Sequence, residues 1–444
     1  MLDIRFIREN PEIIRSALRK RHSNFDFDRF LKADEEYRAI LRETEELRAS
    51  QNLAGEEVSR SGAGEKEAKI AALKELKANL NRKEEALAKA ERDFRKLTLL
   101  VPNIPDPSVP EGEGEENNVE IRRWPTPGVE GPASLASIRR SGPSQGGLQT
   151  PGVGFPAKDH LALMRDLDLA DLERGVKVSG FRGYFLKNDG AMLSLALWKY
   201  ALDYMVSQGF TPFISPALVK EEILTGTGKL PQFREELYGT DDNLFLAATA
   251  EIPMMGYHKD EILSEEELPK KYAALSPCFR REAGSYGKDT RGLFRLHEFM
   301  KVEQIVLCRA EHQESVRWHE ELTRYSEEIL QNLDIPYRVV INSAGDLPFA
   351  FVKMYDIESW LPSEKRYRET HSSSIAHDFQ ARRLNIRYRT PEGKTSFVHS
   401  LNNTAIATPR ILQALLENHQ EADGSVAIPD ALQKYLGREK ISPR

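Results

Sequence analysis

The chain has 444 residues, of which 40% are hydrophobic and 30% charged, enough for two or three domains with a large core. Its formal net charge of −6 excludes a uniformly basic nucleic-acid binder and confines any RNA contact to local basic patches. Two cysteines exclude a disulfide framework, and no apolar run reaches the roughly 18 residues that cross a bilayer. The N-terminus has no apolar signal core, so we expect a cytoplasmic protein without a membrane partner.

Two apolar seams dominate the first hundred residues, after a short helical lead-in that ends near Asn24. Apolar or small residues recur three or four positions apart from Phe30 to Val58 and again from Leu73 to Val101. The segment S-R-S-G-A-G-E-K between the seams predicts a turn. The pattern therefore predicts an antiparallel coiled-coil hairpin with helices of about 30 residues, each roughly 45 Å long.

The outer faces of the two predicted helices alternate acidic and basic residues, which is typical of a solvated coiled coil. The basic residues toward the tip would also suit RNA phosphates, although the pattern does not show which of them touch RNA. They are Arg38, Arg42, Arg48, Arg60, Lys66, Lys69, Lys74 and Lys77.

A change of composition after the helices marks a domain boundary. Residues 101–118 are rich in proline, glycine and acid, which favours a linker. The predicted divisions are a helical N-terminal domain (1–101), a linker (102–123) and a C-terminal domain (124–444). Residues 126–156, with many Ser, Gly and Pro, are predicted to form a surface loop.

The C-terminal domain mixes helices and strands without regular βαβ repetition. Residues 173–186 suggest short strands. Apolar residues at helical spacing predict a helix over 191–208 that ends at Gly209. The following F-T-P-F-I-S-P-A-L-V predicts a strand, and Pro216 favours the edge of a sheet.

The most informative stretch is C-F-R-R-E-A-G-S-Y-G-K-D-T-R-G-L-F-R-L-H-E-F-M-K-V-E, residues 278–303. It predicts two strands joined by a long glycine-rich loop, the second strand already including Leu293 and Arg295. Guanidinium groups grip phosphate or carboxylate at two points, so this hairpin suits an anionic ligand such as a nucleotide. A charged exposed hairpin with ordinary cross-strand ion pairs is the alternative. The charged groups concerned are Arg280, Glu282, Arg291, Arg295 and Glu303.

Four further segments carry glycines or polar groups of chemical interest. They are G-T-G-K-L-P-Q-F (226–233), A-T-A-E-I-P (248–253), Y-R-E-T-H-S-S-S-I-A-H-D-F-Q-A-R-R (367–383) and H-S-L-N-N-T-A-I-A-T-P-R-I-L-Q-A-L-L-E-N (399–418). The glycines of the first favour a mobile lid. The last predicts a strand that leads into an amphipathic helix, with Thr408 as its cap and Pro409 in its first turn.

The pattern F-R-x-E followed by G-x-x-x-x-D-T-R-G-L-x-R-x-H-E-F resembles motif 2 of the class II aminoacyl-tRNA synthetases, in the version of the bacterial seryl-tRNA synthetase family. The predicted helix and Pro216 strand resemble motif 1, residues 399–418 resemble motif 3, and T-A-E resembles the serine-recognition triplet of that family. The resemblance implies an α+β catalytic domain on an antiparallel sheet, an N-terminal coiled-coil arm that binds tRNA(Ser), and a homodimer. Relative to the family, residues 126–156 look like an insertion.

The resemblance also implies roles for individual residues. Arg280 would bridge the carboxylate of L-serine and the α-phosphate of ATP. Glu282 would accept a hydrogen bond from the adenine amino group, and Phe299 would stack on the ring. Mg²⁺ would be held by Glu369 and Ser372, whose carboxylate and hydroxyl are suitable hard-oxygen ligands. The serine-binding set is Thr249, Ala250, Glu251, Arg280, Glu303, Asn402 and Thr404; the ATP-binding set is Arg280, Arg281, Glu282, Phe299, Glu369 and Ser372, with Arg295 and Arg410 for the outer phosphates.

The activity that the resemblance implies is serine activation by ATP, with release of pyrophosphate and transfer of serine to the 3′ end of tRNA(Ser). Whether tRNA(Sec) is also charged stays open. Two departures from the family are the pair Thr370 and His371, and a motif 3 that lacks glycines and carries Asn403 and Pro409. The alternatives are an amino acid ligase that charges a carrier protein, which the arm disfavours, and an inactive RNA-binding paralogue, which the retained Arg280 disfavours.

Overall fold

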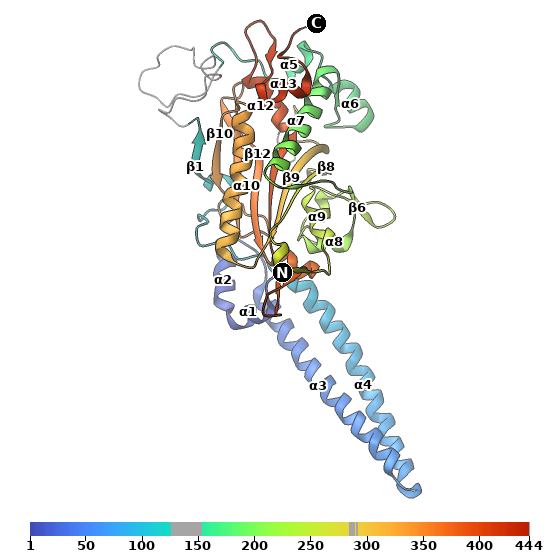
Figure 1. Cartoon of the computed structure of the whole chain (residues 1–444). Helices are drawn as coiled ribbons and strands as arrows, with labels where there is room; N and C mark the ends of the chain where they lie inside the picture. The colour runs from blue at the N-terminus through green and yellow to red at the C-terminus, as the bar shows by residue number, and fades with distance from the viewer. Residues whose placement is uncertain (126–152, 284–288, 290–291, 444) are drawn as a thin grey trace.

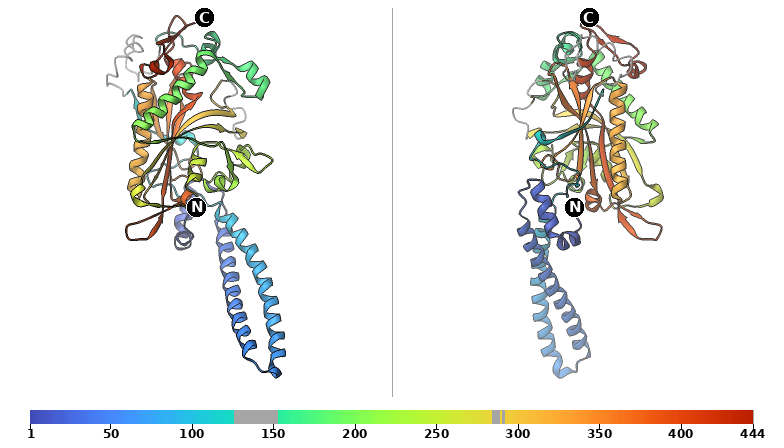
Figure 2. Two further views of the ribbon diagram at one scale, coloured as in Figure 1. Left: turned by 45° about the vertical axis from the view of Figure 1, so that its right-hand side comes forward. Right: turned by 90° about the vertical axis from the view of Figure 1, so that its left-hand side faces the viewer.

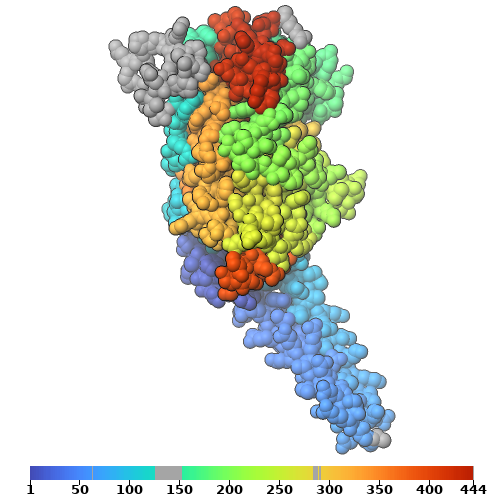
Figure 3. Space-filling view, in the orientation of Figure 1, coloured from blue at the N-terminus to red at the C-terminus, as the bar shows by residue number. Residues whose placement is uncertain are grey.

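The computed structural model describes residues 1–125, 153–283, 289 and 292–443, and it contains a globular body from which a helical arm projects (Figure 1). In the space-filling view the arm stands clear of the body over most of its length (Figure 3). Most of the predicted insertion at 126–156, and Arg291 of the charged hairpin, lie outside the described residues.

The N-terminal domain consists of two short helices, α1 (Ile4–Glu9) and α2 (Pro11–Lys20), and two long ones, α3 (Phe27–Arg60) and α4 (Ala63–Thr98). The long helices pack side by side, with the rings of Tyr37 and Phe94 stacked 5.4 Å apart, which confirms the predicted helical hairpin. The turn is shorter than predicted, because only Ser61 and Gly62 separate the helices. Glu65 in the first turn of α4 favours this early start, since a carboxylate there complements the helix dipole.

An eight-stranded sheet forms the centre of the body, with every neighbouring pair antiparallel except β4 and β8. In spatial order its strands are β1 (Val119–Trp124), β10 (Tyr337–Ile341), β11 (Lys353–Leu361), β12 (Arg366–His377), β15 (His399–Thr408), β9 (Glu298–Cys308), β8 (Lys270–Phe279) and β4 (Thr211–Ile214). The antiparallel α+β domain implied by the resemblance is therefore confirmed. The Thr211–Ile214 strand also lies at the sheet edge, as its proline pattern predicts.

Three helices cover one face of the sheet: α7 (Asn188–Ser207), α10 (His312–Asn332) and α12 (Arg410–Asn418). Figure 2 shows α10, in orange, running along this face. Alternation along β9 separates the two faces, because Val302 and Val306 join the core under these helices whereas Ile305 packs against Met254 of α9 (Glu251–Tyr257). The second face is thus left for α9, α8 (Glu221–Gly226) and α11 (Phe379–Leu384) and for a row of polar side chains.

Smaller elements complete the body. They are α5 (His160–Asp166), β2 (Ala170–Asp171), α6 (Leu172–Ser179), β3 (Phe185–Leu186), β5 (Leu218–Lys220), β6 (Leu244–Leu246), β7 (Ile262–Ser264), β13 (Arg387–Arg389), β14 (Thr395–Phe397), β16 (Val426–Ala427), α13 (Asp430–Leu436) and β17 (Lys440–Ile441), with short 3₁₀ turns at Glu115–Asn117, Arg234–Glu236 and Glu265–Glu267. None of the helices in the described part of the chain combines the length and apolar character that a membrane crossing requires.

The prediction of short strands over 173–186 is wrong for most of that segment. Asp171 caps the helix α6 by accepting from the N–H of Arg174, and Gly180 ends it with a positive φ of 78°. Gly175 allows this helix to lie against the following chain, since a Cβ there would stand 2.4 Å from the Cα of Tyr184. The α7 prediction is confirmed to within a few residues.

Two predicted boundaries near the charged segments are also wrong. The return strand of the hairpin begins at Glu298, so Leu293 and Arg295 belong to the preceding loop. Helix α12 begins at Arg410, and Thr408 is the last residue of β15 rather than a cap. The Thr408 hydroxyl instead accepts from Trp198 Nε1 at 2.8 Å.

Candidate active site

Polar side chains gather on the sheet face opposite α10, from four neighbouring strands. Alternation along β9 places Phe299, Lys301 and Glu303 on this face. Strand β15 adds Asn402 and Thr404, and β12 adds Glu369 and Ser372. Arg280 follows β8, the strand that pairs with β9 on its other side. The structure therefore brings most residues of the predicted serine-binding and ATP-binding sets to one surface.

Glu303 is the centre of the first polar group, and only 1% of it is exposed. Its carboxylate accepts hydrogen bonds from Asn402 Nδ2 at 3.0 Å and from the Thr404 hydroxyl at 3.4 Å. It also forms an ion pair with Lys301, whose Nζ donates to the Thr249 hydroxyl at 2.9 Å. Lys301 was missing from the predicted set, although its alternation with Phe299 and Glu303 along one strand is a signal that could have found it.

A second buried acid stands at the start of α9. Glu251 is 2% exposed, and its Oε1 accepts from Gln380 Nε2 at 2.6 Å. Its backbone N–H donates to the Thr249 hydroxyl at 3.3 Å, which ties the T-A-E triplet together. The side chain of Ala250 packs in an apolar cluster with Met254, so any contact of Ala250 with a ligand falls to its backbone.

Arg280 lies at the end of β8 with its guanidinium over the ring of Phe299, 5.2 Å from the centroid. Its Nε donates a long hydrogen bond, 3.4 Å, to the carbonyl of Ala248 beside the serine triplet. Arg281 takes another direction: its guanidinium lies 6.0 Å from the centroid of Tyr238. The two neighbouring arginines therefore have different surroundings, and only Arg280 adjoins the Phe299 ring.

A chain of ion pairs organises the loop of the hairpin. Arg295 contacts Glu282 at 3.2 Å and Asp289 at 3.1 Å, and Asp289 also contacts Arg368 at 2.7 Å. Arg368 and Arg295 lower the pKa of Asp289 against the opposing effect of its burial. Glu282 is in addition 3.7 Å from Arg182. Asp289 and Arg368 were not in the predicted set, because nothing local in the sequence indicates which strand the loop folds against.

Two guanidinium groups, those of Arg368 and Arg410, line the end of this surface. The ring of Phe294 is held between Arg368 and Arg410, whose Cζ atoms lie 3.7 and 4.3 Å from its centroid. Arg410 also contacts Glu369 Oε1 at 3.1 Å and donates to the Glu369 carbonyl at 3.2 Å. Burial opposes ionisation of Glu369, but Arg410, Arg280 and Arg295 outweigh it and hold the pKa of this carboxyl below its usual value.

Asp356, which the sequence motif did not reveal, lies next to the predicted metal ligands Glu369 and Ser372. It stands opposite Ser372 across β11 and β12, and burial and the nearby Glu369 carboxylate raise its pKa well above the usual range. Its Oδ2 accepts from Asn342 at 2.8 Å, whereas its Oδ1 is a buried oxygen with no hydrogen-bond partner among the residues that the structure describes. The electrostatics thus keep Glu369 ionised and favour the neutral form of Asp356.

The residues that depart from the family pattern lie away from the polar surface or below it. Asn403 Nδ2 donates to the Leu322 carbonyl at 2.6 Å and to the Ser326 hydroxyl at 2.8 Å, both on α10 behind the sheet. His371 is 1% exposed, and burial lowers its pKa to about 3, so it is neutral at physiological pH. Thr370 bonds Ser359 at 2.8 Å. These substitutions therefore alter the support of the site and leave the polar groups of its surface in place.

The fold and the site are those of a class II aminoacyl-tRNA synthetase. The antiparallel sheet carries the charged hairpin with Arg280, the T-A-E triplet lies beside it, and Arg410 follows the last residues of β15. A family model described as tRNA synthetase class II core domain (G, H, P, S and T) matches residues 233–419, and one described as Seryl-tRNA synthetase N-terminal domain matches residues 1–105.

Full-length relatives narrow the class. A serine–tRNA ligase of Deinococcus radiodurans is 43% identical over 99% of both chains, and one of Pyrococcus abyssi is 44% identical over 100% of this chain and 98% of the relative. The solved seryl-tRNA synthetase of Pyrococcus horikoshii complexed with ATP superposes with a TM-score of 0.89, at 41% identity and with full coverage of both chains. A cytoplasmic serine–tRNA ligase of Naegleria fowleri in complex with AMP gives a TM-score of 0.83 at 32% identity, over 100% and 99% of the two chains.

The chain belongs to the seryl-tRNA synthetase family. The serine–tRNA ligase activity and the use of ATP expected from the sequence follow from this membership.

Proposed function

We propose that Arg280 is the point where the serine and nucleotide halves of the site meet. The observation that carries this assignment is its place beside both halves. Its Nε contacts the Ala248 carbonyl next to the serine triplet, while its guanidinium covers Phe299 and contributes to the low pKa of Glu369. A guanidinium in that place neutralises the serine carboxylate and an α-phosphate oxygen together, so the two reacting groups are held in contact.

The proposed serine pocket is the group around Glu303, with Lys301 added to the predicted set. Glu303, Asn402 and Thr404 offer buried hydrogen-bonding groups to a substrate hydroxyl, and Glu251 offers a carboxylate to an ammonium group. A site that hydrogen-bonds a hydroxyl discriminates strongly against alanine, because its buried polar groups are left unpaired. Threonine keeps the hydroxyl and adds a methyl group, so only limited room in the pocket can exclude it.

The proposed reaction needs no nucleophilic side chain. The serine carboxylate attacks the α-phosphorus of ATP in line, the bond to the β-phosphate oxygen breaks, and pyrophosphate leaves. Arg280, Arg295 and Arg410 stabilise the charge that develops on the phosphates, and Glu282 and Phe299 hold the adenine. The terminal hydroxyl of the tRNA then attacks the carbonyl of the seryl-adenylate, and AMP leaves.

Mg²⁺ fits the corner formed by Glu369, Ser372 and Asp356. The donors are all oxygens, and the buried Oδ1 of Asp356, which has no partner within the described ranges, suits a water molecule or a cation. When bound, Mg²⁺ neutralises phosphate charge. Exchange should stop in EDTA and return with added Mg²⁺, and exchange that persists in EDTA would contradict the assignment.

The experiment that tests the proposed function is ATP–pyrophosphate exchange with a panel of amino acids, followed by acceptor assays with tRNA. Serine alone should support rapid exchange, with alanine and threonine far slower, and tRNA(Ser) should then accept the serine. Exchange with another amino acid, or serine transfer to a carrier protein in place of tRNA, would overturn the proposal.

We further propose that residues 1–101 serve as the tRNA arm, joined by the linker 102–123 to a catalytic domain over 124–444. Support comes from the free-standing α3–α4 pair and from the exposed lysines near its tip, Lys66, Lys74 and Lys77. An arm that protrudes from the body can follow the phosphate backbone of an RNA that reaches the site with its 3′ end.

A homodimer through motif 1 is proposed on the apolar surface around the edge strand β4. Ile214 on β4 is 84% exposed, Leu195 on α7 is 52% exposed, and Phe185 on β3 is 46% exposed. A free strand edge with exposed apolar side chains favours association with a second copy of the chain. Sedimentation velocity should give a dimer for the wild type and a monomer for Ile214→Glu combined with Leu195→Glu; a monomeric wild type would contradict this.

A further inference from the structure

The short helix α11 lies between the root of the arm and the serine pocket. It belongs to the D-F-Q-A-R-R segment, to which the motif analysis assigned no function. Its residues form hydrogen bonds in both directions, toward Glu251 on one side and toward the end of α4 on the other. The helix is thus placed to connect the two parts of the molecule.

On the pocket side, Gln380 is the residue that contacts Glu251. It is 2% exposed, and its Nε2 donates to Glu251 Oε1 at 2.6 Å and to the Thr227 carbonyl at 3.3 Å. Its Oε1 accepts from the Ser400 hydroxyl at 2.7 Å, so the orientation of the amide is set at both ends. A buried carboxylate depends strongly on such donors, because an unsatisfied one carries its full desolvation cost. The place of Glu251 therefore depends on the place of Gln380.

Toward the arm, two side chains donate hydrogen bonds to the same backbone carbonyl. The Leu99 carbonyl, at the C-terminal cap of α4, accepts from Arg383 Nη2 at 3.0 Å and from Gln232 Nε2 at 2.9 Å. The last carbonyls of a helix have no partner within the helix, so outside donors hold its end in place. Gln232 lies in the glycine-containing loop 226–233, and Arg383 also donates to the Thr225 carbonyl at 3.0 Å.

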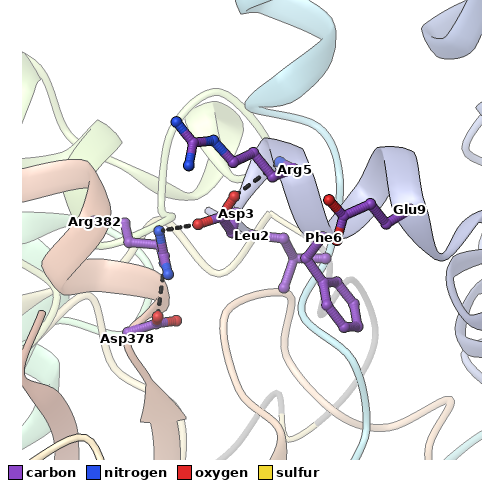
Figure 4. A pocket seen from close by; sticks show the side chains of 7 residues that line it. All are labelled: Leu2, Asp3, Arg5, Phe6, Glu9, Asp378 and Arg382. Carbon is purple, nitrogen blue, oxygen red and sulfur yellow. Dashed lines mark hydrogen bonds and ion pairs between the residues drawn. The ribbon is translucent and has the colours of Figure 1, made fainter. Parts of the chain in front are cut away.

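A second connection joins α11 to the beginning of the chain. Arg382 contacts Asp3 at 2.9 Å and Asp378 at 2.6 Å, and Figure 4 shows these two carboxylates on either side of its guanidinium. They line a pocket of about 460 Å³ between α1 and α11, which lies at the root of the arm rather than at the serine site. The N-terminal domain therefore holds α11 at two places.

Packing makes these connections stiff. Helices α8 and α11 touch so closely at Gly226 that a Cβ there would stand 2.2 Å from Leu384 Cδ2. The guanidinium of Arg383 covers the ring of Phe379, 4.4 Å from its centroid, inside the same helix. A shift of the arm's root would therefore move α11 as a unit, because close-packed elements transmit displacements instead of absorbing them.

We propose that Gln380 is a positioning residue for Glu251, and that two residues pass the position of the arm's root to the serine pocket. They are Arg383, through α11, and Gln232, through the loop 226–233 whose Thr227 carbonyl accepts from Gln380. This inference rests on the proposed function of Glu251 in serine binding. Its consequence is that serine activation depends on the junction between arm and body even when no tRNA is present. The effect falls on serine and spares the nucleotide, because α11 contacts the serine half of the site.

The test is ATP–pyrophosphate exchange by the full-length protein without tRNA, with separate KM values for serine and ATP. Gln380→Ala should raise the serine KM about tenfold or more, and Arg383→Met and Gln232→Ala about fivefold, while the ATP KM stays within about twofold. Gln380→Glu, which keeps the shape but loses the donor, should match or exceed Gln380→Ala. Arg389→Met, an exposed arginine on β13, is the matched control and should leave both constants unchanged.

Coupling between the positions provides a second readout. If Arg383 acts through Gln380, the double variant Arg383→Met, Gln380→Ala should be little worse than Gln380→Ala alone, since residues on one path are non-additive. Additive effects of the two substitutions on the serine KM would show that Arg383 does not act through Gln380, and would overturn the proposal. An equal rise of the serine and ATP constants, with a lowered unfolding temperature, would mark a merely structural role and would also overturn it.

Glu251→Gln separates failure of this inference from failure of the proposed function. A raised serine KM in Glu251→Gln with an unchanged one in Gln380→Ala sinks the inference and leaves the serine pocket standing. An unchanged serine KM in Glu251→Gln removes the pocket assignment itself. Effects in Gln380→Ala but in neither Arg383→Met nor Gln232→Ala would overturn the connection to the arm.

Discussion

A single guanidinium joins the two substrates in the proposed site, and this concentrates the chemistry on Arg280. The arginine directly follows the end of β8, and its guanidinium lies over the Phe299 ring, so a regular strand and a neighbouring side chain set its position. Replacement removes a donor that acts on the developing phosphate charge, for which losses of about 10²–10³-fold are typical.

Arg280→Ala should therefore lower serine-dependent ATP–pyrophosphate exchange by about 10²–10³-fold or more. Arg174→Ala, which removes an exposed arginine of α6 paired with Asp171, is the control and should leave exchange unchanged. Near-normal exchange by Arg280→Ala would refute the role assigned to this residue.

Site residues that belong to a sequence motif could be predicted. Site residues that reach the surface only through strand pairing or helix packing could not. Arg280 and Glu303 stand in one recognisable hairpin. Asp356 reaches the site only because β11 pairs with β12 so that it faces Ser372, and Gln380 only because a helix from another segment packs on α9. Strand register and helix docking are long-range properties, so no local pattern could have predicted either contact.

The long helix α10 supports the sheet from behind through a buried polar network. His319 is fully buried, and its Nε2 donates to the Ser373 carbonyl at 2.9 Å on β12. Desolvation by burial lowers the pKa of His319 to about 4, whereas an unfolded histidine has a pKa of about 6.5. The unfolded state therefore takes up the proton first as the pH falls.

The stability that neutral His319 contributes is complete above pH 6.5 and is lost as the pH falls toward 4, by an amount on the order of 3 kcal/mol. In His319→Gln the free energy of unfolding should depend less on pH over this range, because glutamine keeps a donor but does not titrate. Chemical denaturation at pH 7 and 4.5 measures this, with the exposed His22→Gln as control. An equal pH dependence in wild type and His319→Gln would contradict the prediction.

Helices with regular apolar spacing could be predicted from the sequence. A short helix whose main signals are its capping residues was harder to predict. The spacing over 191–208 and the two arm seams led to helices α7, α3 and α4. Segment 173–186 was misread because Val176 and Val178 alternate as in a strand, while the decisive features, the Asp171 cap and Gly180, act only at the ends of α6. The glycine-poor motif 3 forms the strand β15, and the side chain of Asn403 in it bonds Ser326 on α10.

At the scale of the whole molecule, the proposed tRNA arm projects away from the body that carries the proposed site. Four of the eight basic residues singled out in the arm form ion pairs: Arg38 with Asp34, Arg48 with Glu84, Arg60 with Glu56 and Lys69 with Glu65. Lys66, Lys74 and Lys77 on α4 are exposed and have no ion pair within the part of the chain that the structure describes. Arg42 on α3 is likewise exposed and without an ion pair to any described residue, so Arg42 and these three lysines are the cations most available to RNA phosphates.

Lys74→Glu combined with Lys77→Glu should raise the KM for tRNA in aminoacylation on the order of tenfold at low salt and leave exchange within about twofold of wild type. Lys434→Glu, on α13 at the end of the body far from the arm, is the control (Figure 1). An unchanged tRNA KM in the double variant would show that this stretch of the arm does not carry the RNA.

The measurement that tests the central claim most directly is the position of a non-hydrolysable ATP analogue, with serine, in electron density of the complex. The account predicts the α-phosphate within hydrogen-bond distance of the Arg280 guanidinium, the adenine on Phe299 and the amino acid against Glu303. A nucleotide bound anywhere else, or an α-phosphate out of reach of Arg280, would contradict it.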